Sequence, residues 1–172
     1  GIGAYHRSSA HLYHKIQHAA DFGLKAGAPS VDFKALRARK DDVIKKNKAG
    51  IRNLFKGHGI EVVQGTARVA APGVVRVGEE EIRAGAIIIA TGSSSAQLPG
   101  LETDGERVIT STEALELDAA PKRVLVIGGG PIGAEFASIW NAFGSEVILV
   151  EMMPNLLPLD DAENTKILAN SF

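Results

Sequence analysis

Three glycines carry the clearest chemical signal in this sequence. Gly128, Gly130 and Gly133 form a Gly-x-Gly-x-x-Gly pattern between an apolar run at residues 124–127 and a stretch with helical periodicity at 132–143. A turn of this kind brings backbone N–H groups and the positive end of a helix dipole to one point. The pattern therefore indicates a site for an anionic group such as a phosphate.

Each residue of this turn has its own mechanical task. Gly128 permits the tight turn out of the strand, Gly130 leaves room for a pyrophosphate, and Gly133 lets the helix pack close to the strand. Pro131 suits the first helical position, where its missing N–H would have had no intrahelical acceptor. We therefore expect the N–H groups of Ile132 and Gly133 to face the phosphates of a bound dinucleotide.

A second predicted strand, residues 147–150, ends at Glu151. The acid follows Gly128 at close to the spacing of about 20 residues at which a carboxylate accepts hydrogen bonds from a ribose. A carboxylate there disfavours a 2′-phosphate, and Met152 follows it rather than arginine, so we expect NAD(H) rather than NADP(H). The alternative is a plain strand–helix connection, but strand, proline-started helix, second strand and terminal acid all favour dinucleotide binding.

Composition narrows the function classes. The chain has 172 residues, 45% of them hydrophobic and 23% charged, with a net charge of −1. This charge argues against bulk attraction to nucleic acid or to an anionic membrane. The absence of cysteine excludes disulfides, thiolate metal sites and thiol catalysis within these residues, and it fits a cytoplasmic protein. No apolar stretch is long enough to span a membrane, and we see no signal-peptide pattern.

Histidines near the N-terminus allow a metal-binding alternative. His11, His14 and His18 fall near one face of a helix predicted from about Ala4 to residue 22. A histidine pair at i, i+4 can bind zinc, but Asp21 is the one nearby carboxylate that could complete such a site. We favour a polar helix face and predict no metal, because metal sites need a defined second shell of hydrogen-bond partners.

A long basic helix is predicted after Asp32, which is placed to cap it at residue 33. Its positive charge could attract nucleic acid, but interleaved aromatic residues are missing, so we favour a solvated helix face. Three further strands are predicted at 60–63, 74–77 and 87–90, and the last of them is expected to be buried. A charged turn is predicted at 79–81 and a linker at 118–121. Short helices are predicted at 111–117 and from Asp160 or Asp161. The basic residues of the helix are Lys34, Arg37, Arg39, Lys40, Lys45, Lys46, Lys48, Arg52 and Lys56.

Several motifs, in their order and spacing, resemble one family. They are the Ile-Ile-Ala-Thr-Gly-Ser run at 88–93, Leu-Pro-Gly at 98–100, Ser-Thr-Glu-Ala-Leu at 111–115, and the stretch 128–151. The runs at 9–14 and 65–67 also resemble that family. Together they are similar to the flavin-dependent pyridine nucleotide–disulfide oxidoreductases, and among these to the dihydrolipoamide dehydrogenases. The resemblance covers nearly the whole chain from about Ser8.

The resemblance implies an α/β fold built of two partial Rossmann-like domains. Residues 1–117 would be the second portion of an FAD-binding domain, and residues 118–172 the first βαβ unit of an NAD-binding domain. Ala67 would meet the FAD adenine through its backbone. Thr91, Gly92 and Ser93 would lie against FAD, and Glu135 would be a carboxylate near the flavin, paired with a lysine. The alternative for Glu135 is an acid that stabilises the first turn of its helix.

The resemblance also implies a reaction and partners. Enzymes of this kind pass electrons from dihydrolipoamide through a cysteine pair and FAD to NAD, work as homodimers and serve lipoyl-bearing proteins. Residues 1–6 stand where the second cysteine and a flavin-contacting lysine should lie, and they contain neither. We therefore expect a piece of a longer enzyme that alone neither reduces lipoamide nor binds FAD tightly. The alternatives are a non-catalytic dinucleotide-binding module and a fragment of a mercuric, coenzyme-A or glutathione disulfide reductase.

Overall fold

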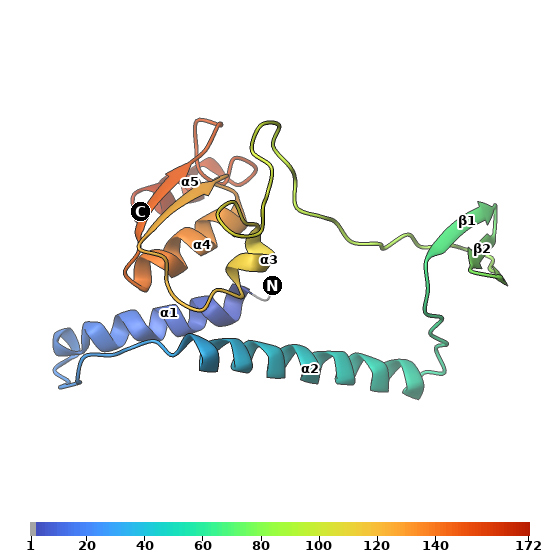
Figure 1. Ribbon diagram of the computed structural model, residues 1–172, viewed down its shortest axis with the longest axis horizontal. Coiled ribbons are helices and arrows are strands. Elements are labelled where there is room, and N and C mark those ends of the chain that lie inside the picture. Colours follow the sequence, from blue (N-terminus) through green and yellow to red (C-terminus); the bar gives the residue numbers. More distant parts are fainter. Residues whose placement is uncertain (1–2) are drawn as a thin grey trace. The chain divides into compact units, whose positions relative to one another are not determined.

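The computed structural model describes residues 3–172 (Figure 1). Residues 1 and 2, the start of the predicted domain 1–117, lie outside the described residues. The chain divides into two compact units, one running to Val43 and resuming over Gln97–Phe172, the other Ile44–Ala96. The helices are α1 (Gly3–Gln17), a short 3-10 helix (Ala19–Phe22), α2 (Phe33–Gly57), α3 (Ser111–Ala114), α4 (Pro131–Ala142) and α5 (Ala162–Ala169). The strands are β1 (Ala67–Ala71), β2 (Val74–Val77), β3 (Glu80–Arg83), β4 (Arg123–Ile127) and β5 (Glu146–Val150).

The first unit is built around a parallel βαβ crossover. Strands β4 and β5 pair in parallel, with Arg123 opposite Glu146 and Ile127 opposite Val150. Helix α4 connects them and packs on one face of the pair (Figure 1). Side chains alternate along a strand, so alternate positions of β4 and β5 are partly buried while those between are exposed. The predicted strand–turn–helix–strand order and the α/β class are confirmed.

The core of this unit lies between α4 and α1. Helix α4 buries Phe136, Ile139 and Trp140, and Ala10 of α1 packs against this cluster. Large apolar residues at positions i, i+3 and i+4 of a helix lie on one face. The buried face of α4 could therefore be predicted from the sequence pattern. Ile132, which the predicted helical periodicity at 132–143 also includes, is 61% exposed in the first turn of α4.

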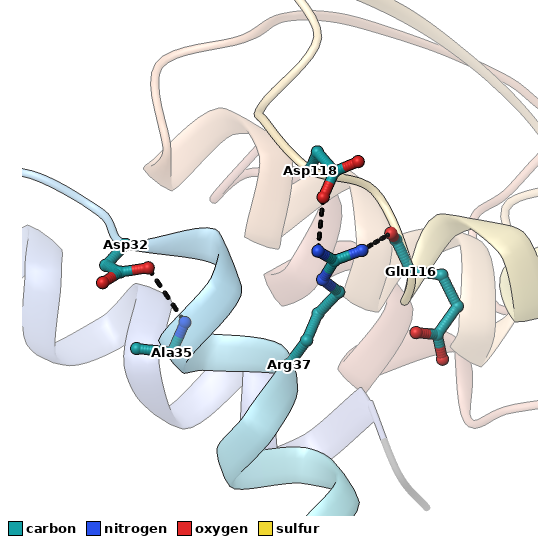
Figure 2. Close-up of polar contacts among 5 residues, drawn as sticks. All are labelled: Asp32, Ala35, Arg37, Glu116 and Asp118. Carbon is teal, nitrogen blue, oxygen red and sulfur yellow. Dashed lines mark hydrogen bonds and ion pairs between the residues drawn. The ribbon is translucent and has the colours of Figure 1, made fainter.

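Capping side chains start the helices where the sequence predicts. Asp32 Oδ1 accepts a hydrogen bond of 2.9 Å from the N–H of Ala35 at the start of α2 (Figure 2). Asp161 Oδ1 accepts one of 2.9 Å from Glu163 N, which places the start of α5 at the second of the two predicted acids. Thr110 and Glu113 form a reciprocal capping box at α3. Each side chain satisfies an amide that the helix itself cannot.

The second unit, Ile44–Ala96, contains an antiparallel sheet in the order β1-β2-β3. The predicted strand at 74–77 is confirmed as β2. The charged turn predicted at 79–81 is wrong for Glu80 and Glu81, which belong to β3 and pair with Val77 and Arg76. Cross-strand pairing with β2 offers these two residues a hydrogen-bonded ladder, and no turn signal such as glycine interrupts them after position 78.

Two predicted strands of this unit are wrong. Residues 60–63 and 87–90 form no strand in the described chain. The second run was predicted to be buried, but Ile88 is 90% and Ile89 74% exposed. An apolar β-branched run becomes a strand only when another strand supplies its hydrogen-bond partners. None of the described strands pairs with either run.

The described helices include none that is both long and apolar enough to cross a membrane.

Candidate dinucleotide site

The turn between β4 and α4 has the geometry that the glycine pattern predicts. Gly128 has φ +105°, a left-handed conformation that side chains disfavour, and its N–H donates to Val150 O at 2.8 Å. This bond ties the start of the turn to the end of β5. Gly130 is the N-cap of α4 and Pro131 opens the helix, as expected from the chemistry of proline.

Gly133 and Gly130, the other two glycines of the motif, differ in their surroundings: one is in close contact with the backbone and the other borders open space. A Cβ built on Gly133 would lie 1.8 Å from Gly128 O, so only glycine allows α4 to approach the turn so closely. A Cβ built on Gly130 would meet nothing within 4 Å, so a side chain there would fill open space beside the turn. The N–H groups of Ile132 and Gly133 belong to the first turn of α4, where a helix has no acceptor of its own. These residues therefore fit the pyrophosphate of a dinucleotide.

Glu151 lies at this turn, as the sequence predicts. Its Oε2 accepts a hydrogen bond of 2.6 Å from Gly129 N, and its Oε1 accepts one of 2.8 Å from Met153 N. The N–H groups of Met153 and Gly129, in that order, lower the pKa of Glu151, because hydrogen bonds to a carboxylate favour its charged form. An ionised acceptor is thus held beside the glycines at the end of β5.

The loop after β5 also forms a hydrogen bond with Gly129. This contact was not predicted from the sequence. Leu157 N donates to Gly129 O at 2.8 Å, and Leu157 takes a left-handed backbone conformation with φ +48°. Both polar groups of Gly129 therefore have partners in the segment that follows β5. No periodicity or motif in residues 152–160 indicates this contact, because a loop's hydrogen bonds depend on its folded path.

Glu135 lies in the first turns of α4 and is paired, but not with a lysine. Its Oε1 is 3.7 Å from an Nη atom of Arg7 on α1. Among the described residues its ion-pair partner is an arginine of the neighbouring helix, and the lysine partner that the resemblance implies stays a prediction. The pair links α1 to the same end of α4 that carries the free amides, while the proposed place of Glu135 near a flavin stays a prediction.

The remaining predicted site residues belong to the unit Ile44–Ala96. Ala67 begins β1 opposite Val77, and Thr91, Gly92 and Ser93 are exposed residues outside the strands. Gly92 has φ +76°, which suits glycine at a bend. Their contact with FAD stays a prediction.

The three histidines considered for a metal site, His11, His14 and His18, are exposed. His14 and His18 stack with ring centroids 4.2 Å apart, and His18 Nδ1 lies 2.9 Å from His14 O. Residues 3–172 contain no group of three or more side chains placed to hold a metal ion.

The basic helix contains one clear departure from the predicted solvated face. Lys40 is 3% exposed and its Nζ contacts the carboxylate of Glu116. His6 of α1 is equally buried, at 3%. Neither residue stands out in the sequence, since lysines and histidines alternate with other polar residues along both helices, and only the path of the chain after α3 brings Glu116 to them.

Comparisons with known proteins agree with this geometry. Residues 5–172 match the family described as pyridine nucleotide-disulphide oxidoreductase. The chain is 39% identical over 169 residues to the dihydrolipoyl dehydrogenase of Zymomonas mobilis, covering 95% of this chain and 36% of the relative. It is 43% identical over 161 residues to that of Thermus scotoductus, covering 93% and 34%. The chain thus spans about a third of the length of these relatives.

Solved structures give the same result. The structure of LpdA from Mycobacterium tuberculosis superposes with a TM-score of 0.84 at 26% identity, over 99% of this chain and 39% of that one. The Cu(II) complex of the flavoprotein disulfide reductase RclA from Escherichia coli superposes with a TM-score of 0.72 at 27% identity, over 99% and 36%. The resemblance inferred from the motifs is confirmed, and the chain belongs to the pyridine nucleotide-disulphide oxidoreductase family.

Proposed function

We propose that the chain binds NAD(H) at the turn between β4 and α4, as part of a dihydrolipoyl dehydrogenase. The observation that carries this proposal is the placement of Glu151, whose carboxylate accepts from Gly129 N at 2.6 Å. An acceptor for the ribose hydroxyls thus stands beside the open space at Gly130 and the free amides of Ile132 and Gly133. This is the set of groups that a dinucleotide needs.

Within this proposal the two domains have separate cofactors. Residues 1–117 contribute to an FAD-binding domain, and residues 118–172 begin an NAD-binding domain. Ala67, Thr91, Gly92 and Ser93 would contact FAD, and Glu135, with its partner Arg7, would lie near the flavin. The family resemblance supports these roles. When bound, the two cofactors supply hydride and electron transfer, for which the side chains described here have no counterpart.

The whole enzyme would oxidise dihydrolipoamide and reduce NAD through a redox disulfide and FAD. It would act on a lipoyl-bearing protein, as a homodimer in the cytoplasm. The names of the curated relatives support the substrate class. The printed sequence has no cysteine, so the redox disulfide in this proposal comes from outside these 172 residues.

The lack of cysteine also favours a second candidate, a dinucleotide-binding module without redox chemistry. The two candidates predict the same nucleotide site but different parent proteins. Mass spectrometry of the protein in its source distinguishes them. A species about three times the length of this chain supports the enzyme, whereas a species of 172 residues supports the module.

A direct binding experiment tests the proposed site. We expect NADH to bind the purified chain, with a rise in nicotinamide fluorescence on titration, and to bind more tightly than NADPH. We expect no reduction of lipoamide by NADH and no tightly retained flavin. The absence of saturable NADH binding by a folded chain would contradict the proposed site, and lipoamide turnover would contradict the assignment of the disulfide to other residues.

Replacing Glu151 tests the basis of nucleotide choice. The substitution Glu151→Gln removes the charge that accepts from the ribose, and we expect NADH affinity to fall about tenfold, as for loss of a hydrogen bond to a charged group. The preference for NADH over NADPH should shrink, because the repulsion of a 2′-phosphate is lost. Glu146→Gln, at the opposite end of β5, is the matched control and should leave both affinities unchanged. Isothermal titration calorimetry measures the affinities of the unmodified chain and of both variants for NADH and for NADPH.

A further inference from the structure

An ion pair between the buried Lys40 and the exposed Glu116 joins α2 to the segment that follows α3. The side chain of Lys40 is 3% exposed, and its Nζ contacts a carboxylate oxygen of Glu116 and lies 3.2 Å from Asp41 Oδ1. Burial alone would lower the pKa of Lys40, but the hydrogen bonds with Glu116 and Asp41 outweigh it and raise that pKa. The lysine is therefore a permanent cation inside the unit.

A second cation, one turn earlier on α2, holds the same segment. Arg37 donates to Glu116 O at 2.7 Å and to a carboxylate oxygen of Asp118 (Figure 2). Figure 2 shows the guanidinium lying between the two residues, with one nitrogen directed at each. Lys40 and Arg37 thus fasten the start of the connection that leads into β4.

His6 of α1 is a buried titratable residue with an unpartnered ring nitrogen. It is 3% exposed, and within residues 3–172 its Nδ1 has no hydrogen-bond partner. Burial and the Lys40 ammonium lower the pKa of His6, while the Glu116 carboxylate opposes them. A positive charge on buried His6 would lose its hydration and would be repelled by Lys40. The folded chain therefore favours the neutral form of His6.

The charges around His6 connect the cluster to the nucleotide-binding helix. The charged groups that act on the pKa of His6 are Lys40 on α2, which is paired with Asp41, and Glu116 on the α3–β4 connection, whose backbone carbonyl accepts from Arg37. The next residue on α1, Arg7, is paired with Glu135 on α4. A change in the position of α1 at His6 must therefore also change the contact at the first turns of α4.

We propose that buried His6 acts as an acid-sensitive latch, which holds α1 against α4 while His6 is neutral and releases α1 when His6 takes a proton. The sign follows from linkage. A histidine whose pKa in the folded chain is below the ordinary 6.5 contributes its full stabilisation above that pH and loses it as the pH falls through the folded value. The latch does not depend on nucleotide binding, so it can be tested without NADH.

Two measurements on the 172-residue chain test the latch. In the first, NMR follows the ring carbons of the histidines between pH 8 and pH 4.5, with exposed His58 as the internal reference. We expect His6 to titrate at a lower pH than His58. In the second, hydrogen exchange gives protection factors at pH 7.5 and 5.5. Residues 4–10 and 113–118 should lose protection by up to about tenfold, the limit that an unfolded histidine of ordinary pKa sets between these two pH values, while β2 keeps its protection.

Matched variants separate a proton switch from a merely structural contact. His6→Leu cannot take a proton and should keep the same protection at both pH values, whereas His58→Leu should behave as the unmodified chain. Lys40→Met should move the His6 titration to higher pH, because the repelling charge is gone. If His6→Leu does not fold, the titration of His6 in the unmodified chain and in Lys40→Met still tests the proposal. Titration of His6 at or above the pH of His58, or the same acid loss of protection in His6→Leu, would overturn the proposal.

Discussion

Replacing Gly133 by alanine is expected to destabilise severely the crossover that carries the proposed nucleotide site. The added Cβ would lie 1.8 Å from Gly128 O and 3.0 Å from Gly128 C. Both are backbone atoms of the turn, so no side chain can rotate to make room. The turn or the start of α4 must move, and we expect the free energy of unfolding to fall by at least about 3 kcal/mol, within the range of severe strain.

Urea denaturation followed by circular dichroism measures this loss, and Gly130→Ala is its matched control. A Cβ at Gly130 meets nothing within 4 Å, and its φ of −70° suits any residue. Gly130→Ala should therefore change the free energy of unfolding by less than about 1 kcal/mol yet greatly weaken NADH binding, because the methyl group occupies the space proposed for the pyrophosphate. Equal stability of the two variants would contradict the close-approach role of Gly133.

Truncating Ile139 is the second change with a large expected effect. Ile139 is 1% exposed and lies in the cluster between α4 and α1, with Trp140 and Phe136. Ile139→Ala removes buried apolar volume and leaves a cavity that rings packed on several sides cannot fill by small shifts. We expect a loss of about 2–5 kcal/mol of unfolding free energy.

The control for this change lies on the same helix. Ile132 is 61% exposed in the first turn of α4, so Ile132→Ala should cost less than about 0.5 kcal/mol, as is usual for surface positions. Because both substitutions replace isoleucine by alanine in one helix, the difference in helix propensity cancels. Thermal or urea unfolding of the pair gives the comparison. A similar loss in both variants would show that the α4–α1 cluster does not hold this unit together.

The sequence was sufficient to predict the crossover because its local signals agree. The glycine turn, the proline at the first helical position, the apolar stripe on α4 and the acid after β5 each depend on neighbours within a few residues. In that situation backbone geometry and hydrophobic periodicity leave little choice. The placement of Glu151 beside Gly129 followed from the parallel pairing of two strands joined by one helix.

Predictions failed where the outcome depends on residues far away in the sequence. The run at 87–90 has the composition of a buried strand, but no described strand lies beside it to complete a ladder. Lys40 looks like one more charge on a solvated helix, yet Glu116, which is distant along the chain, makes its burial tolerable. Long-range pairing of this kind has no period and no motif, so it could not be predicted from local pattern.

The two bonds that Glu151 accepts from Gly129 and Met153 have a consequence for ligand association. A free glutamate samples many rotamers, and ordering it on contact would reduce affinity. Here the side chain is already anchored at both oxygens, so in the proposed NAD(H) complex a ribose would meet a preorganised carboxylate. The fixed carboxylate of Glu151 would then discriminate between NAD(H) and NADP(H) as soon as the nucleotide binds, without a conformational change of the loop.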